Sequence, residues 1–396
     1  MAMSGLHISR VVCNVLHKDL GRSQRSGGLM SATIYSTFGR LLTMRRGSAR
    51  RATIQDVAQA AGVSPSAVSK VLRAAYGVSP EMRARVNDAI EQLGYRPHTG
   101  ARAMRGRSFT IGVMLTELSS PFQPEVVDGI SAELDSSPFQ AILTVGGALA
   151  EGQKRGIEAL VDRQVDGLVL IAPFVSQSWL EKLTASVPTV VVARHGGGDN
   201  YDSVVDDDYE GARLMVDHLA ALGHRRIVHL THPSGGLKRP FVLSQTARCD
   251  GYVKAMERNG LEPDVIETHW SEDGGYRAAV EALGRSTRPT AIFGGADIAA
   301  LGALRAAEEL GYRVPEDLSI VGYDNIYVST IGRISLTTVD QSGHLTGATS
   351  ARLLLERIAG RTRPVHYVVA PRLLPRSTSA AAAADTATRR RSTSPR

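Results

Sequence analysis

Short apolar runs alternate with helix-length segments from near Ile111 as far as Asn325, and this alternation permits few folds. The helix-length segments include YEGARLMVDHLAALG and ALGALRAAEELGY, and both close at a glycine. Continuous apolar strands that alternate with helices are typical of parallel sheets covered on both faces. The runs, in chain order, are IGVMLTE, AILTVGG, VDGLVLIAP, VPTVVVAR, RRIVHLTH, TAIFGGAD and LSIVGYDN. So many strands predict two α/β lobes, with a ligand site at strand ends between them.

The charge of the chain is distributed unevenly. Counting Lys and Arg against Asp and Glu gives +8 for residues 44–107 and −8 for residues 108–376. A basic piece joined to an acidic body predicts a polyanionic partner for that piece alone. We interpret 1–49 as a disordered or misannotated extension, because Met44 begins a more plausible natural start. The low-complexity stretch 377–396 is predicted to be a disordered tail.

Several classes of protein are excluded by what the sequence lacks. No apolar run is long enough to span a bilayer, and the first thirty residues show no secretory signal, so we expect no membrane partner and a cytoplasmic location. Cys13 and Cys249 have no close partner, which excludes a disulfide framework or a cysteine-built zinc site. Neither a Walker loop nor a Gly-x-Ser-x-Gly elbow is present, so we predict neither an enzyme nor a cofactor. His229 and His232 are interpreted as structural or surface histidines rather than metal ligands.

Residues 50–96 predict three short helices. Thr53 and Asp56 have the spacing of a capping box, and Gly62 permits a tight turn. Ser64-Pro65 and Ser79-Pro80 are typical starts of the second and third helices. The positions expected to face inward are Val68, Val71, Leu72, Val86, Ile90 and Leu93.

The second of these helices has a basic outward face. Ser66, Lys70 and Arg73 fall at positions that share one side of a helix. A short helix with such a face suits the major groove of DNA, where Lys or Arg can reach guanine or phosphate. The alternative is an ordinary three-helix bundle whose charges are only solvated.

The stretch TIQDVAQAAGVSPSAVSKVLRAAYGVSPEMRARVNDAIEQLGYRPHTGARAM resembles the headpiece of the LacI/GalR (lactose-repressor) family of bacterial regulators. The resemblance continues through DSVVDDDYEGA, HLAALGHRRI, RVPEDLSIVGYDN and LTTVDQ, and covers about residues 50–376. It implies an all-α helix-turn-helix headpiece over 50–96 and a hinge helix over 97–107. It also implies a two-lobed periplasmic-binding-protein-like core of parallel sheets over 108–376, in which the chain crosses between lobes three times.

The resemblance also implies which residues contact DNA. Lys70 stands where Arg is common, and Lys is a point charge rather than a bidentate fork. Met104 stands where Leu usually enters the minor groove as an apolar wedge, in a segment too short to be a stable helix by itself. The residues implied for DNA binding are Thr53, Ser64, Pro65, Ser66, Ser69, Lys70, Arg73, Ala101, Met104 and Arg105.

For the body, the resemblance implies a small-molecule site in the cleft between the lobes. An aromatic platform beside an Arg and a carboxylate would fix a polyhydroxylated ring, so a sugar or polyol fits best and a nucleobase remains an alternative. Phe122 could instead be core, and Arg194 an ion pair between lobes. The residues implied for effector binding are Ser120, Phe122, Gln123, Arg194, Arg248, Trp270, Asp297 and Asp324.

Together these features predict a ligand-responsive transcriptional regulator, a repressor rather than an activator, located on the nucleoid in the cytoplasm. A homodimer would place two recognition helices in successive major grooves of a pseudo-palindromic operator. Whether the ligand releases DNA or acts as a corepressor stays open. The alternatives are a solute-binding receptor of the same two-lobed fold and a sugar-processing enzyme with a fused DNA-binding domain.

Overall fold

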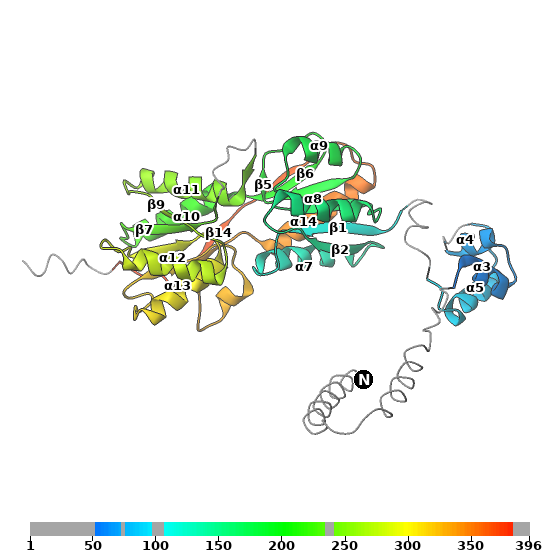
Figure 1. Cartoon of the computed structure of the whole chain (residues 1–396), viewed down its shortest axis with the longest axis horizontal. Coiled ribbons are helices and arrows are strands. Elements are labelled where there is room, and N and C mark those ends of the chain that lie inside the picture. The colour runs from blue at the N-terminus through cyan, green and yellow to red at the C-terminus, as the bar shows by residue number, and fades with distance from the viewer. Residues whose placement is uncertain (1–51, 73–75, 97–106, 234–240, 383–396) are drawn as a thin grey trace, which may run out of the picture. The chain divides into compact units, whose positions relative to one another are not determined.

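The structure is a computed structural model that describes residues 52–72, 76–96, 107–233 and 241–382. The chain divides into two compact units between Pro97 and His98 (Figure 1). The smaller unit holds three helices, and the larger unit holds two parallel sheets with helices on their faces. No helix within the described ranges has both the length and the apolar character needed to cross a membrane.

The smaller unit consists of α3 (Ile54–Ala61), α4 (Pro65–Leu72) and α5 (Pro80–Gln92). The predicted capping box is confirmed: the Thr53 hydroxyl accepts from the Asp56 amide at 3.3 Å, while the Thr53 amide donates to the Asp56 carboxylate at 2.7 Å. Gly62 closes α3 in the left-handed region at φ 63°, which a residue with a side chain rarely adopts. Ser79 caps α5 by accepting from the Met82 amide at 3.2 Å.

The three helices share a small apolar core. Leu72 and Leu93, which were expected to face inward, are instead exposed by 39% and 41%. That prediction was wrong because Leu72 is the last residue of α4 and Leu93 follows α5, so each lies where less of the bundle covers it. The buried members of the core are Val57, Ala58, Ala61, Val68, Val71, Val86 and Ala89.

The first lobe of the larger unit is built on a sheet in the order β13-β6-β4-β3-β1-β2, with every pairing parallel. Helices α7 (Phe122–Leu134) and α14 (Gly343–Ile358) pack on one face, and α8 (Ala150–Val161) and α9 (Gln177–Thr184) on the other. The strands are β1 (Thr110–Leu115), β2 (Gln140–Val145), β3 (Gly167–Ile171), β4 (Thr189–Val192), β6 (Asp202–Asp206) and β13 (His366–Val369).

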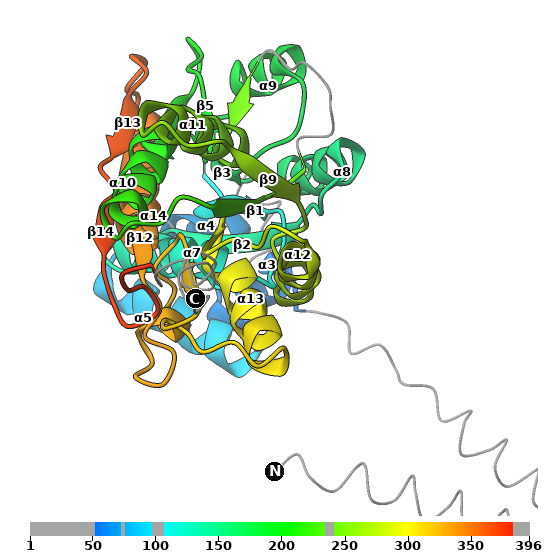
Figure 2. The ribbon, with the colours of Figure 1, turned by 90° about the vertical axis from the view of Figure 1, so that its left-hand side faces the viewer.

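The second lobe has a parallel sheet in the order β11-β10-β7-β9. Helices α12 (Glu272–Gly284) and α13 (Asp297–Glu309) cover one face, and α10 (Asp208–Ala221) and α11 (Ser244–Arg258) cover the other (Figure 2). The strands are β7 (Ile227–Thr231), β9 (Asp264–Glu267), β10 (Ala291–Gly294) and β11 (Ser319–Val321). The prediction of two α/β lobes with parallel, doubly covered sheets is therefore confirmed.

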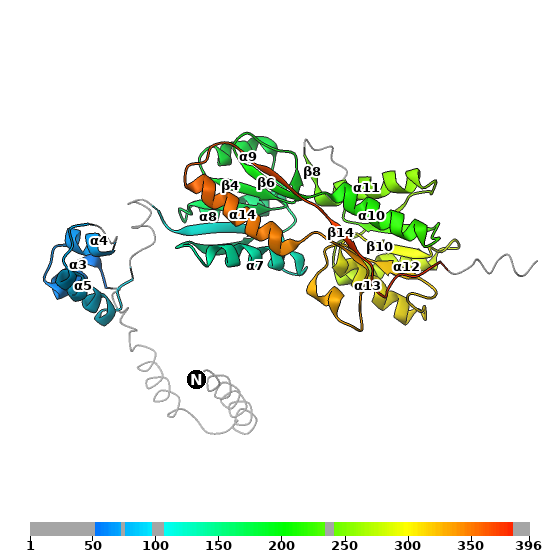
Figure 3. The ribbon, with the colours of Figure 1, turned by 180° about the vertical axis from the view of Figure 1, so that it is seen from behind.

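The chain passes between the lobes three times, as the resemblance implied (Figure 3). It leaves the first sheet at the end of β6 and returns between β12 (Thr338–Asp340) and α14. It leaves again after β13 and forms β14 (Arg372–Leu374), which pairs antiparallel with β12. A further antiparallel pair, β5 (Arg194–His195) with β8 (Val242–Leu243), and the 3-10 turn η1 (Tyr327–Thr330) complete the unit.

The start of the predicted disordered tail is ordered. Thr378 is buried, its hydroxyl accepts from the Thr337 amide at 2.9 Å, and its carbonyl accepts from the Ile320 amide at 2.9 Å. The Ala382 amide donates to Leu222 at 2.8 Å. The prediction of disorder was wrong for residues 377–382, because their backbone completes hydrogen bonds of the second lobe. Residues 383–396 lie outside the described part.

Candidate functional site

The outward face of α4 presents the headpiece residues that could contact DNA. Ser64, Pro65, Ser66 and Lys70 are all exposed, and Lys70 makes no ion pair with any residue that the structure describes. The Ser64 hydroxyl accepts from the Ala67 amide at 3.2 Å and lies 2.8 Å from the Ser66 hydroxyl. The helix start is therefore fixed by local hydrogen bonds, while the side chain of Lys70 stays available to a partner.

Two other headpiece residues predicted to contact DNA have different surroundings. Ser69 is only 9% exposed, because it turns toward the core side of α4 with Val68 and Val71, so its side chain is less available to DNA than that of Lys70. Thr53 is half-buried, and its hydroxyl is bonded to Asp56. The remaining predicted positions, Arg73, Ala101, Met104 and Arg105, lie outside the described residues.

A cavity of about 560 Å³ opens between the two lobes of the larger unit. Its size is that of a site for a small organic molecule. Six of the eight predicted effector residues line it: Ser120, Phe122, Gln123, Arg248, Trp270 and Asp324. Further polar side chains in its wall are Thr116, Glu117, Gln153, His232, Ser244, Gln245, His269, Ser271 and Gln341.

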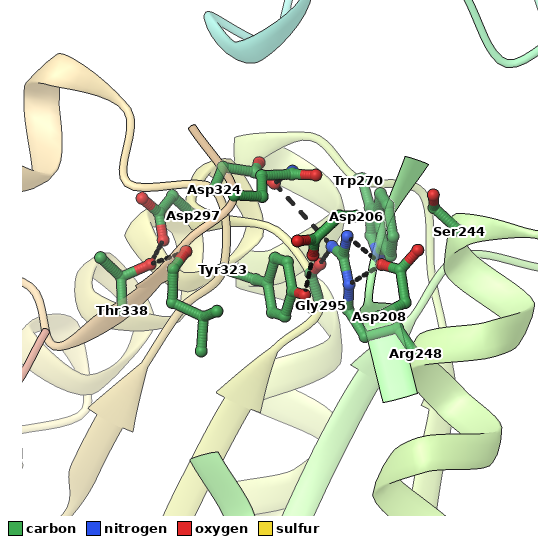
Figure 4. A network of polar contacts seen from close by, with 12 residues as sticks. Asp206, Asp208, Ser244, Arg248, Trp270, Gly295, Asp297, Tyr323, Asp324 and Thr338 are labelled. Carbon is green, nitrogen blue, oxygen red and sulfur yellow. Dashed lines mark hydrogen bonds and ion pairs between the residues drawn. The ribbon is translucent and has the colours of Figure 1, made fainter. Parts of the chain in front are cut away.

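Arg248 is the central charge of the cleft and is itself neutralised (Figure 4). From α11 its Nε and Nη2 donate to Asp208 Oδ1 at 3.1 and 2.7 Å, and Nη1 donates to the Gly295 carbonyl. The guanidinium also lies 3.5 Å from the ring centre of Tyr323. Burial by itself lowers the pKa of Arg248, but the combined effect of Asp208, Tyr323 and Asp324 outweighs burial and raises that pKa. Three of the five N–H groups are thus used within the protein, and two remain for a ligand.

Asp324 lies on the other side of Arg248, after β11. Its Oδ1 is 3.8 Å from Arg248 Nη1 and accepts a hydrogen bond from Gln341. Burial raises the pKa of Asp324 well above its usual range, and this exceeds the opposing effect of Arg248. A carboxyl in such surroundings can accept or donate a hydrogen bond to a ligand hydroxyl.

Trp270 supplies an aromatic wall next to these charges. Its ring centre lies 5.0 Å from the Arg248 guanidinium carbon, and its indole N–H donates to Leu230 at 3.4 Å. Gly295 makes room for it, because a Cβ there would lie 2.6 Å from the Leu230 carbonyl and 2.9 Å from the indole. His232 packs edge-on against the Trp270 ring at 5.9 Å between centres.

Two predicted effector residues, Arg194 and Asp297, are not among the residues that line the cavity. Arg194 is buried: it donates to Pro173, Val175 and Gln177 at 3.0, 2.8 and 2.7 Å. It forms no ion pair among the described residues, and burial lowers its pKa to about 10. Asp297 begins α13 and accepts from the Ile326 amide at 3.0 Å and from the hydroxyls of Ser329 and Thr338 at 2.6 and 2.5 Å. The hydrogen bonds of Arg194 and Asp297 are made to neighbouring loops of the protein. Both side chains therefore stabilise these loops.

Comparison with known proteins gives a consistent picture. Residues 53–98 match the bacterial regulatory proteins of the lacI family, and residues 216–379 match the periplasmic binding protein-like domain. The HTH-type transcriptional repressor PurR of Yersinia enterocolitica is 34% identical over 340 residues, which cover 82% of this chain and 96% of that protein. PurR of Proteus mirabilis is 33% identical over 337 residues, with the same shares covered. The chain belongs to the lacI family of bacterial regulatory proteins.

Solved structures of the lacI family agree with this assignment. The Lac repressor dimer bound to operator and an anti-inducer has a TM-score of 0.72 and 30% identity, and covers 84% of this chain and 100% of that one. The complex of the regulator CelR with cellobiose has a TM-score of 0.61 and 30% identity, with 83% and 100% covered. The chain is thus a DNA-binding transcriptional regulator, and the prediction that it is not an enzyme is confirmed by its relatives.

Sequence reasoning did not assign His232 to the cleft of this lacI-family chain, and it did not single out Asp208, which pairs with Arg248 there. Asp208 was not singled out, although three consecutive aspartates after an apolar run, Asp206 to Asp208, are an unusual signal at a strand end. His232 was read as structural or surface, yet it lines the cavity. His229 is fully buried beside Tyr252 and Phe293, and burial lowers its pKa to about 3. No group of His, Cys, Asp and Glu side chains able to hold a metal ion occurs among the described residues.

Proposed function

We propose that this regulator represses transcription as a homodimer bound to a pseudo-palindromic operator, and that a small molecule in the interlobe cleft changes its affinity for DNA. The observation that carries the proposal is the combination, in one chain, of an exposed Lys70 face on α4 with a cavity of about 560 Å³ in the two-lobed unit. The relatives named above are repressors, and one similar structure is a dimer on operator DNA. A solute-binding receptor would have no use for the headpiece.

The DNA contacts are assigned to the exposed residues of α4 and to the segment that follows the headpiece. Ser64, Pro65, Ser66 and Lys70 would meet the major groove, together with Arg73. Ala101, Met104 and Arg105 would act near the operator centre, where an apolar side chain can open a base step. We place the protein on nucleoid DNA in the cytoplasm.

The effector is proposed to be an uncharged sugar or polyol. Trp270 and Phe122 offer apolar faces on which a ring can stack, and Asp324, Gln341, Ser244 and the remaining N–H groups of Arg248 can bond hydroxyls. Similar structures of the family contain cellobiose and ribose. Arg248 lines the cleft, but its charge is already balanced by Asp208. It therefore does not require an anionic ligand.

A two-step experiment tests the proposal. Operator fragments selected from random DNA by the full chain should show two related half-sites, and gel-shift titration should give a dimer complex. A panel of sugars and polyols should then contain a compound that raises the thermal unfolding midpoint, since a ligand that binds only the folded state stabilises it. The same compound should change the operator dissociation constant; a stabilising compound without that effect would contradict the regulatory role of the cleft.

A further inference from the structure

Asp206 and Tyr323 join the two lobes at the first point where the chain passes between them. Asp206 is the last residue of β6 in the first lobe, and Tyr323 follows β11 in the second. The Tyr323 hydroxyl is hydrogen bonded to Asp206 Oδ2 (Figure 4). Gly211 in α10 makes room for this contact, because a Cβ there would lie 2.1 Å from the tyrosine oxygen.

The charges around this contact do not balance. Asp206, Asp208 and Asp324 are exposed by 6%, 0% and 4%, and the cation among them is Arg248, which is 1% exposed. Asp208 takes that cation directly and also bonds His195 Nε2 at 2.7 Å. Three ionised carboxylates around one guanidinium would leave a net negative charge in a buried place. Such a group holds a proton instead of remaining charged.

Asp206 has few interactions that would stabilise its ionised form. Among the described residues it has no ion pair, and its Oδ1 has no hydrogen-bond donor although the atom is buried. The charged groups that face it are Asp207, Asp208 and Arg248, with the Tyr323 phenol as its bonded neighbour. Arg248 donates its hydrogen bonds to Asp208 rather than to Asp206, so its positive charge stabilises an ionised Asp206 less. An ionised Asp206 would therefore carry a buried negative oxygen without a partner.

We propose that Asp206 holds a proton in the folded protein at neutral pH, and that loss of this proton in mildly alkaline solution weakens the junction between the lobes. Ionisation of Asp206 would add a negative charge beside Asp208. Asp206 ends β6 in the first lobe and Asp208 begins α10 in the second, so the two charges would repel each other where the lobes are connected. Burial and, next, the charge of Asp208 raise the pKa of Asp206 to about 8. Arg248 and Asp324, which belong to the same cluster of charges, line the effector cavity. The proton of Asp206 therefore lies close to the cavity wall.

The direction of the pH effect follows from linkage. An aspartate in the unfolded chain has a pKa of about 3.9, so between about pH 4 and about pH 8 the folded chain holds a proton that the unfolded chain has released. The contribution of Asp206 to stability is therefore complete below the unfolded pKa and is lost as the pH rises toward the folded one. Asn at this position keeps the shape of the neutral acid and cannot ionise.

The first test compares unfolding of the full chain in urea for wild type and Asp206→Asn from about pH 6 to about pH 8. The folding constant of wild type relative to the variant should fall by about tenfold from about pH 6 to about pH 7, because one proton is released on unfolding, and by less from about pH 7 to about pH 8, where the folded protein also begins to release it. Asp199→Asn, which removes an exposed carboxylate, is the matched control and should follow wild type. Parallel curves for wild type and Asp206→Asn would overturn the proposal.

A second measurement covers the case in which Asp206→Asn does not fold. In wild type with carboxyl-labelled aspartate, infrared spectra at about pH 7 should show the carbonyl stretch of protonated acids, and the component that belongs to Asp206 should disappear by about pH 9. Tyr323→Phe should move the band that belongs to Asp206, because it removes the bonded hydroxyl. If no acid band responds to Tyr323→Phe, Asp206 is ionised and the proposal is wrong.

A third measurement addresses regulation and rests on the proposed function. The operator dissociation constant of wild type should change between about pH 7 and about pH 9 by a factor that Asp206→Asn removes. Equal pH dependence in both proteins would refute the link between this proton and DNA binding. Absence of operator binding at either pH would instead refute the proposed function, while the unfolding test would still decide the protonation of Asp206.

Discussion

The recognition face of α4 and the cleft between the lobes handle charge in opposite ways. On α4, Lys70 is exposed and has no ion-pair partner among the described residues. In the cleft, Arg248 is buried, shares two hydrogen bonds with Asp208 and donates a third to Gly295. An exposed cation is available to a polyanion, whereas a buried cation must be matched inside the protein. The headpiece therefore offers charge to its partner, and the cleft offers shape and hydrogen bonds.

The largest expected effect tests the buried side of this comparison. Asp208→Ala leaves the Arg248 guanidinium buried without its main partner, so the free energy of unfolding should fall by about 3–5 kcal/mol. Urea unfolding monitored by tryptophan fluorescence measures it. Asp217→Ala removes another carboxylate of the same helix, paired near the surface with Arg213 and Arg258, and should cost about 0–1 kcal/mol. Equal losses in the two variants would show that the Asp208 pair is no more important than a surface pair.

The next effect tests the exposed side. Lys70→Ala should weaken operator binding by about 1–3 kcal/mol and leave the unfolding midpoint unchanged, because the side chain makes no ion pair within the described part of the headpiece. Gel-shift titration at several salt concentrations gives the slope of log affinity against log salt concentration, which reports the number of phosphate contacts. This slope should become less steep in Lys70→Ala if Lys70 contacts a phosphate. Lys182→Ala, an exposed lysine of α9, should bind operator like wild type. A lower unfolding midpoint in Lys70→Ala would contradict the conclusion that Lys70, unlike Arg248, has no stabilising role within the protein.

A smaller effect concerns the aromatic wall of the cleft. Trp270→Ala should reduce the affinity for a stabilising sugar by about 0.5–1.5 kcal/mol, because the stacking face is lost. The other tryptophan of the chain, Trp179, packs against the core of the first lobe and serves as the control. Trp179→Ala should lower the unfolding midpoint but keep the shift that the sugar produces. A full sugar response in Trp270→Ala would remove this residue from the effector site.

The smallest effect separates the stability of the two units. Ser79→Ala removes the cap of α5, whose hydroxyl accepts from the Met82 amide, and should cost about 1 kcal/mol. Hydrogen exchange should become faster in α3, α4 and α5 and stay unchanged in the strands of both lobes. Faster exchange throughout the chain would show that the headpiece and the body unfold together.

The fold was largely predictable because its signals are local. The seven apolar runs quoted above overlap with β1, β2, β3, β4, β7, β10 and β11, and the glycines that close α10 and α13 lie at φ 88° and 78°. Two strands of the first sheet that sequence reasoning did not single out, β6 and β13, pair with each other across a long stretch of chain. Residues 377–382 were misjudged for a related reason: their order comes from hydrogen bonds to the distant Ile320, Thr337 and Leu222.

The site was predictable only in part. Arg248, Trp270 and Asp324 were assigned to the cleft, and they line it. Arg194 and Asp297 carry the same kinds of side chain but are turned into the protein, where backbone carbonyls or hydroxyls bind them. A charged residue at a strand or helix end has the same sequence signal in either case. The positions of its nearest donors and acceptors decide the difference.

Local signals in the amino-acid sequence were sufficient to predict the capped helices of the headpiece, the two-lobed α/β body and the charge contrast between headpiece and body. These follow from residue spacing, turn chemistry and composition, which act over a few neighbouring positions. Three features became visible only in the folded chain: Arg248 is neutralised by Asp208, His232 faces the cleft, and Asp206 is hydrogen bonded to Tyr323. Each of these contacts depends on which side chains from separate elements are buried next to one another. Burial matters because a charge without a partner is unfavourable inside the protein.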